Sequence, residues 1–188
     1  MLDGALRLPT LEATRLRLRP VTASDDAALL AIWGDAAVCR YGAHPPLADL
    51  AAAAAYRGLI ETGFATRTLF QWAIELHANG AVVGTCTLSS VCAAHRRAEL
   101  GFGLRTDAWG RGYATEAVAR LLDAAFGDLG FHRIEADVDP RNDASLGLLE
   151  RIGFRREGLC RQRYFVNDEW QDGILLGLLA TDVRRARG

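Results

Sequence analysis

Seven segments of the chain carry the two-residue alternation or the short apolar runs that are typical of β-strands. Residues 15–19 alternate arginine with leucine before Pro20, which ends the pattern. A turn between two strands is marked by His77-Ala78-Asn79-Gly80, because Asn-Gly favours tight hairpins. Asn167-Asp168-Glu169 marks a second turn. The predicted strands are residues 15–19, 69–76, 81–91, 96–104, 131–138, 154–166 and 170–179.

Four other segments repeat apolar residues at the spacing of one helix face. The first, around residues 28–33, can be capped by Thr22 or Ser24. The other three predicted helices are residues 47–62, 114–126 and 142–151. Glycines are the expected stops of the last three, namely Gly63, Gly127 or Gly130, and Gly153. The order β-α-α-β-β-β-α-β-α-β-β predicts a single α/β domain over residues 1–188, a mixed sheet with helices against it.

Composition places the chain among ordinary globular proteins. Half of its residues are hydrophobic, 24% are charged, and the formal net charge is -1, so nucleic acid is not an expected partner. No run approaches the ~20 apolar residues of a membrane span, and the N-terminal residues lack the apolar core of a signal peptide. We therefore expect a cytoplasmic protein with no membrane partner.

The kinds of side chain exclude some chemistry. All 22 basic residues are arginine, so no lysine can form a Schiff base or complete a P-loop. The four cysteines include no C-x-x-C pair, which suits reduced thiols. The four histidines make no i, i+4 pair, so we expect no metal site.

The strongest motif is Trp109-Gly110-Arg111-Gly112-Tyr113-Ala114-Thr115-Glu116-Ala117, which lies between a predicted strand and a predicted helix. The first amides of a helix lack partners within the helix, and with the helix dipole they favour phosphate. Glycines let a phosphate approach the backbone. A tight turn with no ligand would also use glycine, but a dinucleotide-binding fold would place this turn after its first strand.

The residues 109–114 resemble the pyrophosphate-binding motif [Q/R]-x-x-G-x-[G/A] of the GNAT superfamily, except that Trp109 stands at its first position. The element order also matches that fold. Glu99-Leu100-Gly101-Phe102, Asn142-x-x-Ser145 and Gly153-Phe154 around the turn are similar to the RimJ/RimL branch, the ribosomal-protein N-terminal acetyltransferases. The resemblance covers most of the chain and implies the GNAT fold, a mostly antiparallel mixed sheet of about seven strands flanked by four helices.

The resemblance implies acetyl-CoA as co-substrate, with no metal. The backbone amides of residues 111–115 would hold the CoA pyrophosphate, and the strand at Phe102 to Leu104 would pair with the pantetheine arm and offer an oxyanion donor. The implied cofactor-binding residues are Phe102, Gly103, Leu104, Trp109, Gly110, Arg111, Gly112, Tyr113, Ala114, Thr115, Asn142 and Ser145.

Catalysis needs a base for the acceptor ammonium and an acid for the departing thiolate. The tyrosine that much of the superfamily uses as acid is Leu149 here, so Ser145 is the candidate acid, with helix capping as the rival interpretation. Glu99 is the candidate base, with a solvated strand carboxylate as its rival. Glu116 and Glu150 are expected to be structural. Residues of the last hairpin that can shape an acceptor pocket are Tyr164, Asn167 and Asp172.

Three functions remain open at this point. The resemblance implies transfer of an acetyl group to a peptide or protein N-terminal α-amine. The same chemistry could serve a small amine such as a polyamine, an amino acid or an antibiotic. Leu149 also permits a CoA-binding module that has lost catalysis. A homodimer is implied by the resemblance alone.

Overall fold

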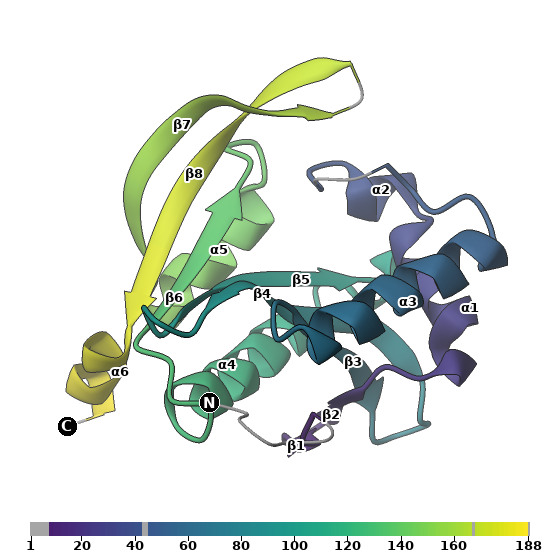
Figure 1. Ribbon diagram of the computed structural model, residues 1–188, viewed down its shortest axis with the longest axis horizontal. Coiled ribbons are helices and arrows are strands. Elements are labelled where there is room, and N and C mark those ends of the chain that lie inside the picture. Colours follow the sequence, from purple (N-terminus) through teal and green to yellow (C-terminus); the bar gives the residue numbers. More distant parts are fainter. Residues whose placement is uncertain (1–7, 43–44, 167, 188) are drawn as a thin grey trace.

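The computed structural model describes residues 8–42, 45–166 and 168–187, which form a layered α/β structure around one sheet (Figure 1). The sheet has eight strands in the order β1-β2-β3-β4-β5-β6-β8-β7. All neighbours are antiparallel except β5 and β6, which are parallel. The strands are β1 Leu11–Glu12, β2 Leu16–Pro20, β3 Phe70–Leu76, β4 Val82–Cys92, β5 Arg97–Leu104, β6 Arg133–Val138, β7 Arg155–Val166 and β8 Glu169–Leu179.

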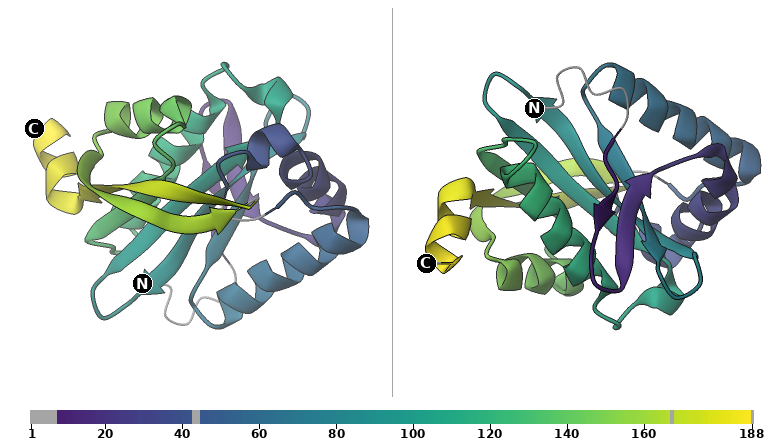
Figure 2. Two further views of the ribbon diagram at one scale, coloured as in Figure 1. Left: turned by 90° about the horizontal axis from the view of Figure 1, so that it is seen from above. Right: turned by 90° about the horizontal axis from the view of Figure 1, so that it is seen from below.

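Helices cover both faces of the sheet (Figure 2). On one face, α1 lies so close that a Cβ at Gly103 would be 2.6 Å from the Trp33 ring, and α3 lies beside it. On the other face, α4 and α5 place Val118, Leu121 and Leu149 in the main core. The helices are α1 Asp26–Trp33, α2 Ala36–Cys39, α3 Leu50–Ala65, α4 Tyr113–Phe126, α5 Asp143–Ile152 and α6 Ala180–Arg187, with 3₁₀ turns η1 Ala23–Asp25 and η2 Thr106–Ala108.

The fold class and the order of the long elements are confirmed, but two element counts were wrong. The described chain has eight strands rather than seven, because β1 is only two residues long and has no alternation to detect. It has six α-helices rather than four. The four-residue α2 depends on Asp35, whose side chain accepts a hydrogen bond from the Ala37 amide, and α6 directly continues the last strand.

The predicted boundaries of α3 were also wrong. The helix begins after Asp49, whose Oδ1 accepts a hydrogen bond from Ala52 N at 2.8 Å, so it starts three residues later than expected. Gly63 does not stop it and is buried within it. A Cβ at Gly63 would be 2.6 Å from the Leu69 Cβ, so glycine is needed where the chain folds back after Ala65.

Both predicted hairpins are present. Gly80, with φ of +68°, closes the turn between β3 and β4. In the turn between β7 and β8, Asn167 lies outside the described residues, and Asp168 has a φ of +59°. Together β7 and β8 project beyond the rest of the sheet (Figure 1).

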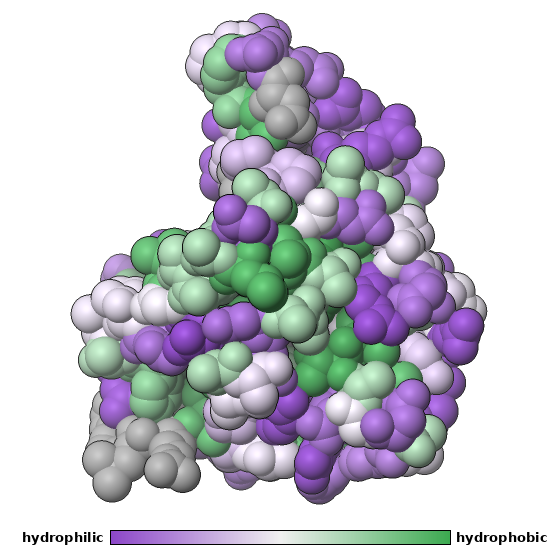
Figure 3. Space-filling model, turned by 90° about the vertical axis from the view of Figure 1, so that its right-hand side faces the viewer, coloured by the Kyte–Doolittle hydropathy of each residue, from purple (hydrophilic) through white to green (hydrophobic). Residues whose placement is uncertain are grey.

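Apolar residues also reach the surface. Figure 3 views the side that carries α1, α2 and α3, where apolar residues gather across the middle and hydrophilic ones lie above and below. Leu50 and Leu59 on α3 are both more than half exposed. Among the described residues, no helix is both long and apolar enough to cross a membrane.

Candidate active site

Strands β5 and β6 separate partway along their length. Their pairing runs only from Arg97 opposite Arg133 to Glu99 opposite Glu135, while β5 continues to Leu104. Beyond Glu99, the edge of β5 that faces β6 therefore has no strand partner among the described residues. An extended substrate arm could pair with this free edge as a further strand does.

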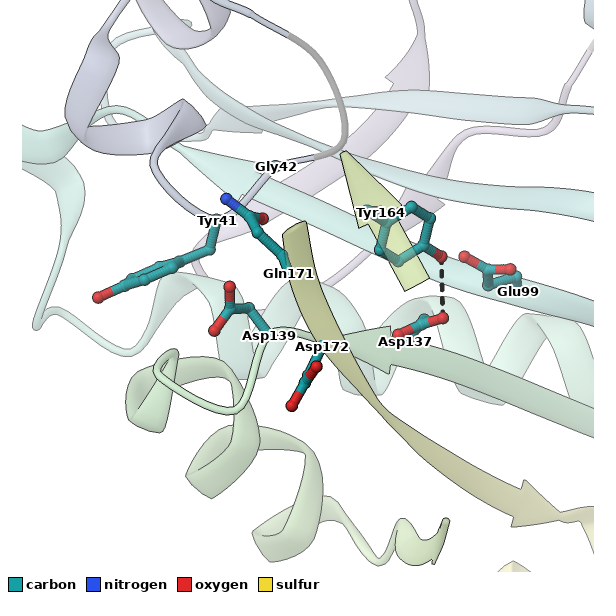
Figure 4. A pocket seen from close by; sticks show the side chains of 8 residues that line it. All are labelled: Tyr41, Gly42, Glu99, Asp137, Asp139, Tyr164, Gln171 and Asp172. Carbon is teal, nitrogen blue, oxygen red and sulfur yellow. Dashed lines mark hydrogen bonds between the residues drawn. The ribbon is translucent and has the colours of Figure 1, made fainter. Parts of the chain in front are cut away.

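Two adjoining cavities open at this separation. We call the first the acidic cavity, because four of its lining residues are carboxylates (Figure 4). It is lined by Tyr41, Gly42, Glu99, Asp137, Asp139, Tyr164, Gln171 and Asp172. We call the second the helix cavity, because the start of α5 lines it. Its residues are Tyr41, Leu100, Gly101, Phe102, Ala136, Asp137, Val138, Asp139, Asn142, Ser145 and Leu149.

The glycine turn after β5 has the geometry of an anion site. Gly110 and Gly112 adopt φ values of +71° and +78°, a left-handed conformation that other residues rarely adopt. Gly112 is the N-cap of α4, and a Cβ at Gly110 would meet no atom within 4 Å. The helix has 14 residues, and its first amides, at residues 113–115, have no acceptor within the helix. Exposed amides and the helix dipole together suit a phosphate.

Arg15, in the bend just before β2, holds this turn in place. Its Nη1 donates to the Arg111 carbonyl at 2.9 Å, and its N and Nε each donate to the Glu116 carboxylate at 2.6 Å. Its guanidinium also lies over the Tyr113 ring. Although burial works to raise the pKa of Glu116, the bonds from Arg15 outweigh it and hold that pKa below its usual value. These contacts support a structural role for Glu116.

Trp109 links the end of β5 to the turn. Its Nε1 donates to the Leu104 carbonyl at 2.8 Å, although the side chain is 51% exposed. The Leu104 side chain belongs to the core, and Phe102 is packed against that core while lining the helix cavity. Any contact of Leu104 with a substrate would therefore have to come from its backbone.

At the start of α5, Asn142 acts as the cap of the helix. Its Oδ1 accepts a hydrogen bond from Ser145 N at 3.1 Å. The Ser145 hydroxyl has no hydrogen-bond partner among the described residues. Capping therefore accounts for Asn142 but leaves the hydroxyl of Ser145 available at the helix cavity.

Glu99 lines the acidic cavity and is half-buried. Burial raises the pKa of Glu99 above its usual value, and the nearby Asp137 raises it further, while Arg163 acts in the opposite direction. A carboxylate with a raised pKa holds an abstracted proton better at neutral pH than an ordinary one. Glu150, in contrast, forms an exposed ion pair with Arg156.

Of the three hairpin residues predicted for an acceptor pocket, Tyr164 and Asp172 line the acidic cavity, and Asn167 lies outside the described residues. Five other lining residues were not predicted from the sequence, namely Tyr41, Gly42, Asp137, Asp139 and Gln171. The one local signal was the pair of acids in the run Ala136-Asp137-Val138-Asp139 at the end of a strand.

Asp139 shapes the turn from β6 to α5. It is buried, and it accepts hydrogen bonds from the backbone N and the guanidinium of Arg141, which lower its pKa. Arg141 also donates to Glu169 at 3.0 Å, so it joins this turn to the projecting hairpin.

None of the four free cysteines lines either cavity. Cys39 and Cys86 are buried, and burial raises the pKa of Cys86 to about 12. Such a thiol is protonated at neutral pH and is a poor nucleophile.

The chain is similar in sequence to known proteins. A family model described as the acetyltransferase (GNAT) domain matches residues 15–155. The uncharacterised N-acetyltransferase p20 of Bacillus licheniformis is 34% identical over 154 residues, which are 82% of this chain and 86% of p20. The spermidine N(1)-acetyltransferase of Vibrio cholerae is 31% identical over 91 residues, 48% of this chain and 53% of that protein.

Among solved structures, Mycobacterium smegmatis RimJ in complex with CoA-disulfide superimposes with a TM-score of 0.83. It is 26% identical, and the match covers 95% of each chain. The resemblance to the RimJ/RimL branch is thereby confirmed. The family match spans the glycine turn, the free edge of β5 and the start of α5, and the chain therefore belongs to the GNAT family of N-acetyltransferases.

Proposed function

We propose that the protein transfers an acetyl group from acetyl-CoA to a primary amine in a ternary complex. The free edge of β5 beyond Glu99 carries this proposal, because it runs between the glycine turn and the two cavities. The pyrophosphate would bind the amides of residues 111–115, and the pantetheine arm would extend along β5 towards the helix cavity.

The chain supplies a group for each proton transfer. Glu99 takes a proton from the acceptor ammonium in the acidic cavity, and the neutral amine attacks the thioester carbonyl. The C–N bond forms and the C–S bond breaks while a backbone amide of Phe102 to Leu104 stabilises the oxyanion. Ser145 gives its proton to the departing thiolate and regains one from solvent, while the nitrogen, which carries one surplus proton after its attack, releases that proton to solvent to leave the neutral amide.

The leading acceptor is the α-amine of a peptide or protein N-terminus. The RimJ structure, similar over nearly the whole length of both chains, supports this choice. The projecting hairpin also supports it, because Tyr164 and Asp172 of β7 and β8 line the acidic cavity and a bound peptide could contact that hairpin.

A polyamine is the second candidate. It is favoured by the four carboxylates of the acidic cavity, which suit a substrate with several positive charges. The partial match to a spermidine acetyltransferase is consistent with it. A CoA-binding module without catalysis remains the alternative from another class, since Leu149 replaces the usual tyrosine.

An acceptor screen tests the proposal. Acetyl-CoA would be mixed with peptides bearing free N-termini, N-blocked copies of the same peptides, spermidine and amino acids, and thiol release and product mass would be followed. We expect acceptor-dependent thiol release and a product heavier by one acetyl group, with the blocked peptides inert. Tight acetyl-CoA binding with no acceptor-dependent release would support the non-catalytic module instead.

A further inference from the structure

Asp137 is a buried carboxylate at the junction of three strands. It belongs to β6, and its side chain is only 4% exposed. Tyr164 of β7 donates its hydroxyl hydrogen to Asp137 Oδ2 at 2.8 Å (Figure 4). The Arg163 guanidinium contacts the same oxygen. Burying a carboxylate this fully costs free energy unless ion pairs and hydrogen bonds compensate for the lost hydration.

Only one of the two carboxylate oxygens of Asp137 has such partners. Asp137 Oδ1 is buried and has no hydrogen-bond partner among the described residues. It lies against the backbone of Gly173 on β8, where an added Cβ would overlap it. Glycine at 173 therefore makes room for this carboxylate. Asp137 is not needed merely to hold β6 and β7 together, because the ion pair between Arg133 and Glu157 already joins these two strands at the exposed surface.

Asp137 shares the acidic cavity with Glu99. Glu99 is opposite Glu135 in the β5–β6 pairing, so Asp137, two residues further along β6, lies on the same face of the sheet. Figure 4 shows the Asp137 carboxylate and the Tyr164 hydroxyl next to Glu99. The other charged or titratable groups that act on Glu99 or share its cavity are Arg97, Glu135, Arg163, Asp139, Asp172 and Tyr41.

We propose that Asp137 is a positioning residue for Glu99: Tyr164 and Arg163 hold its carboxylate so that a fixed negative charge faces Glu99 across the acidic cavity. This charge draws the acceptor ammonium towards Glu99 and strengthens Glu99 as the acceptor of its proton. The inference rests on the proposed role of Glu99 as base. It assigns Asp137 no bond to the reacting atoms.

Substitutions at Asp137 and Tyr164 should shift the pKa of Glu99 in opposite directions. A negative neighbour disfavours the ionised form of Glu99, consistent with its raised pKa. Asp137→Asn removes that neighbour, so the pKa of Glu99 should fall. Tyr164→Phe removes a hydrogen-bond donor that offsets the charge of Asp137, so the pKa of Glu99 should rise. A purely structural role for both residues would not give shifts of opposite sign.

The direct test is a carbon-13 NMR titration of the glutamate carboxyl carbons, in which the Glu99 signal is identified by its loss in Glu99→Gln. Asp137→Asn should move the Glu99 titration to lower pH, and Tyr164→Phe should move it to higher pH. Glu157→Gln is the matched control, because it breaks a β6–β7 ion pair away from the cavity, and it should leave the Glu99 titration unchanged. An unchanged titration in both Asp137→Asn and Tyr164→Phe overturns the proposal, and Tyr164→Phe alone decides it if Asp137→Asn fails to fold.

Kinetics separate this inference from the function on which it rests. With a hexapeptide bearing a free N-terminus as one probe and spermidine as another, the acid limb of kcat/KM should follow the NMR titration, and Asp137→Asn should lower the plateau about tenfold. If the NMR shifts occur but Glu99→Gln keeps full activity, Asp137 does act on Glu99 but Glu99 is not the base. If Glu99→Gln abolishes the acid limb of kcat/KM while Asp137→Asn leaves both the Glu99 titration and that limb unchanged, Glu99 is the base and only the proposed role of Asp137 is wrong.

Discussion

Gly112 adopts a φ of +78° at the residue where the glycine turn enters α4. An alanine there costs about 1–2 kcal/mol in this left-handed conformation. Its Cβ would also lie 3.3 Å from Nη2 of Arg15, the residue that holds the turn. We expect Gly112→Ala to weaken CoA binding about tenfold, measured by calorimetry, because the strain is relieved by moving the amides that contact the phosphate.

Gly80→Ala provides the matched control. Gly80 has a φ of +68° in the turn between β3 and β4, and a Cβ there meets no atom within 4 Å. Gly80→Ala should therefore lower the free energy of unfolding by about as much as Gly112→Ala while leaving the CoA dissociation constant unchanged. Unaltered CoA affinity in Gly112→Ala would show that the phosphate binds elsewhere.

Ser145 offers a second test at single-residue resolution. Its backbone N–H bonds to Asn142 whatever its side chain, so Ser145→Ala removes the hydroxyl and keeps the cap. A CoA thiolate is a fair leaving group, with a thiol pKa near the ~8.5 of cysteine, so a general acid should contribute at the low end of its usual range. We expect kcat to fall about a hundredfold with nearly unchanged CoA affinity, measured by steady-state kinetics and calorimetry.

A different kinetic pattern would reassign Ser145. If kcat is kept and only the KM for acetyl-CoA rises, the hydroxyl is a cofactor contact, and the proton must come from water or from Tyr164.

Helix α3 contains two glycines, Gly58 and Gly63, whose replacement by alanine distinguishes the effect of side-chain packing from that of helix propensity. Gly58 faces open space, whereas a Cβ at Gly63 would be 2.6 Å from the Leu69 Cβ. Gly58→Ala should stabilise the protein by about 0.5–1 kcal/mol, because alanine has the better helix propensity. Gly63→Ala should destabilise it by about 1–3 kcal/mol through overpacking.

Denaturant unfolding of the two variants measures both effects. Because both variants replace glycine by alanine in the same helix, a difference between their unfolding midpoints reports the difference in packing. Equal shifts of the two midpoints would mean that Leu69 is not packed against Gly63.

The long elements could be predicted from the sequence because each carries its own periodicity. Residues 16–19 of β2 and the apolar stripe of α4 that includes Val118 and Leu121 are recognisable without any tertiary contact. The two-residue β1 and the four-residue α2 are too short for such a signal. The predicted end of α3 at Gly63 was wrong because a glycine is needed there to make room for Leu69, and local sequence does not reveal that contact.

In the candidate site, too, local patterns could be predicted from the sequence and contacts between distant segments could not. The glycine turn and the Asn142-x-x-Ser145 start of α5 are local patterns, so they could be read from sequence. The acidic cavity is not local: β8 lies between β6 and β7 in the sheet, yet Tyr164 reaches from β7 to Asp137 of β6. Tyr41, from the segment before α3, joins the same cavity. Which acids meet there depends on the strand order and on the separation of β5 from β6.

At the scale of the whole molecule, the two cavities adjoin and share Tyr41, Asp137 and Asp139. Donor and acceptor can therefore be bound together, and no cysteine lines the space between them. We expect sequential steady-state kinetics and no acetylated cysteine after incubation with acetyl-CoA, judged by mass spectrometry. Parallel double-reciprocal plots together with an acetylated cysteine would instead establish a covalent intermediate.

In the proposed complex, acetyl-CoA binds along the free edge of β5 and across the N-terminus of α4. Hydrogen–deuterium exchange with and without saturating CoA, read by mass spectrometry, tests it most directly because it locates the protected amides. We expect slower exchange in peptides covering residues 100–104 and 111–116, with no change in α3. Protection confined to other segments, when calorimetry shows that CoA is bound, would contradict it.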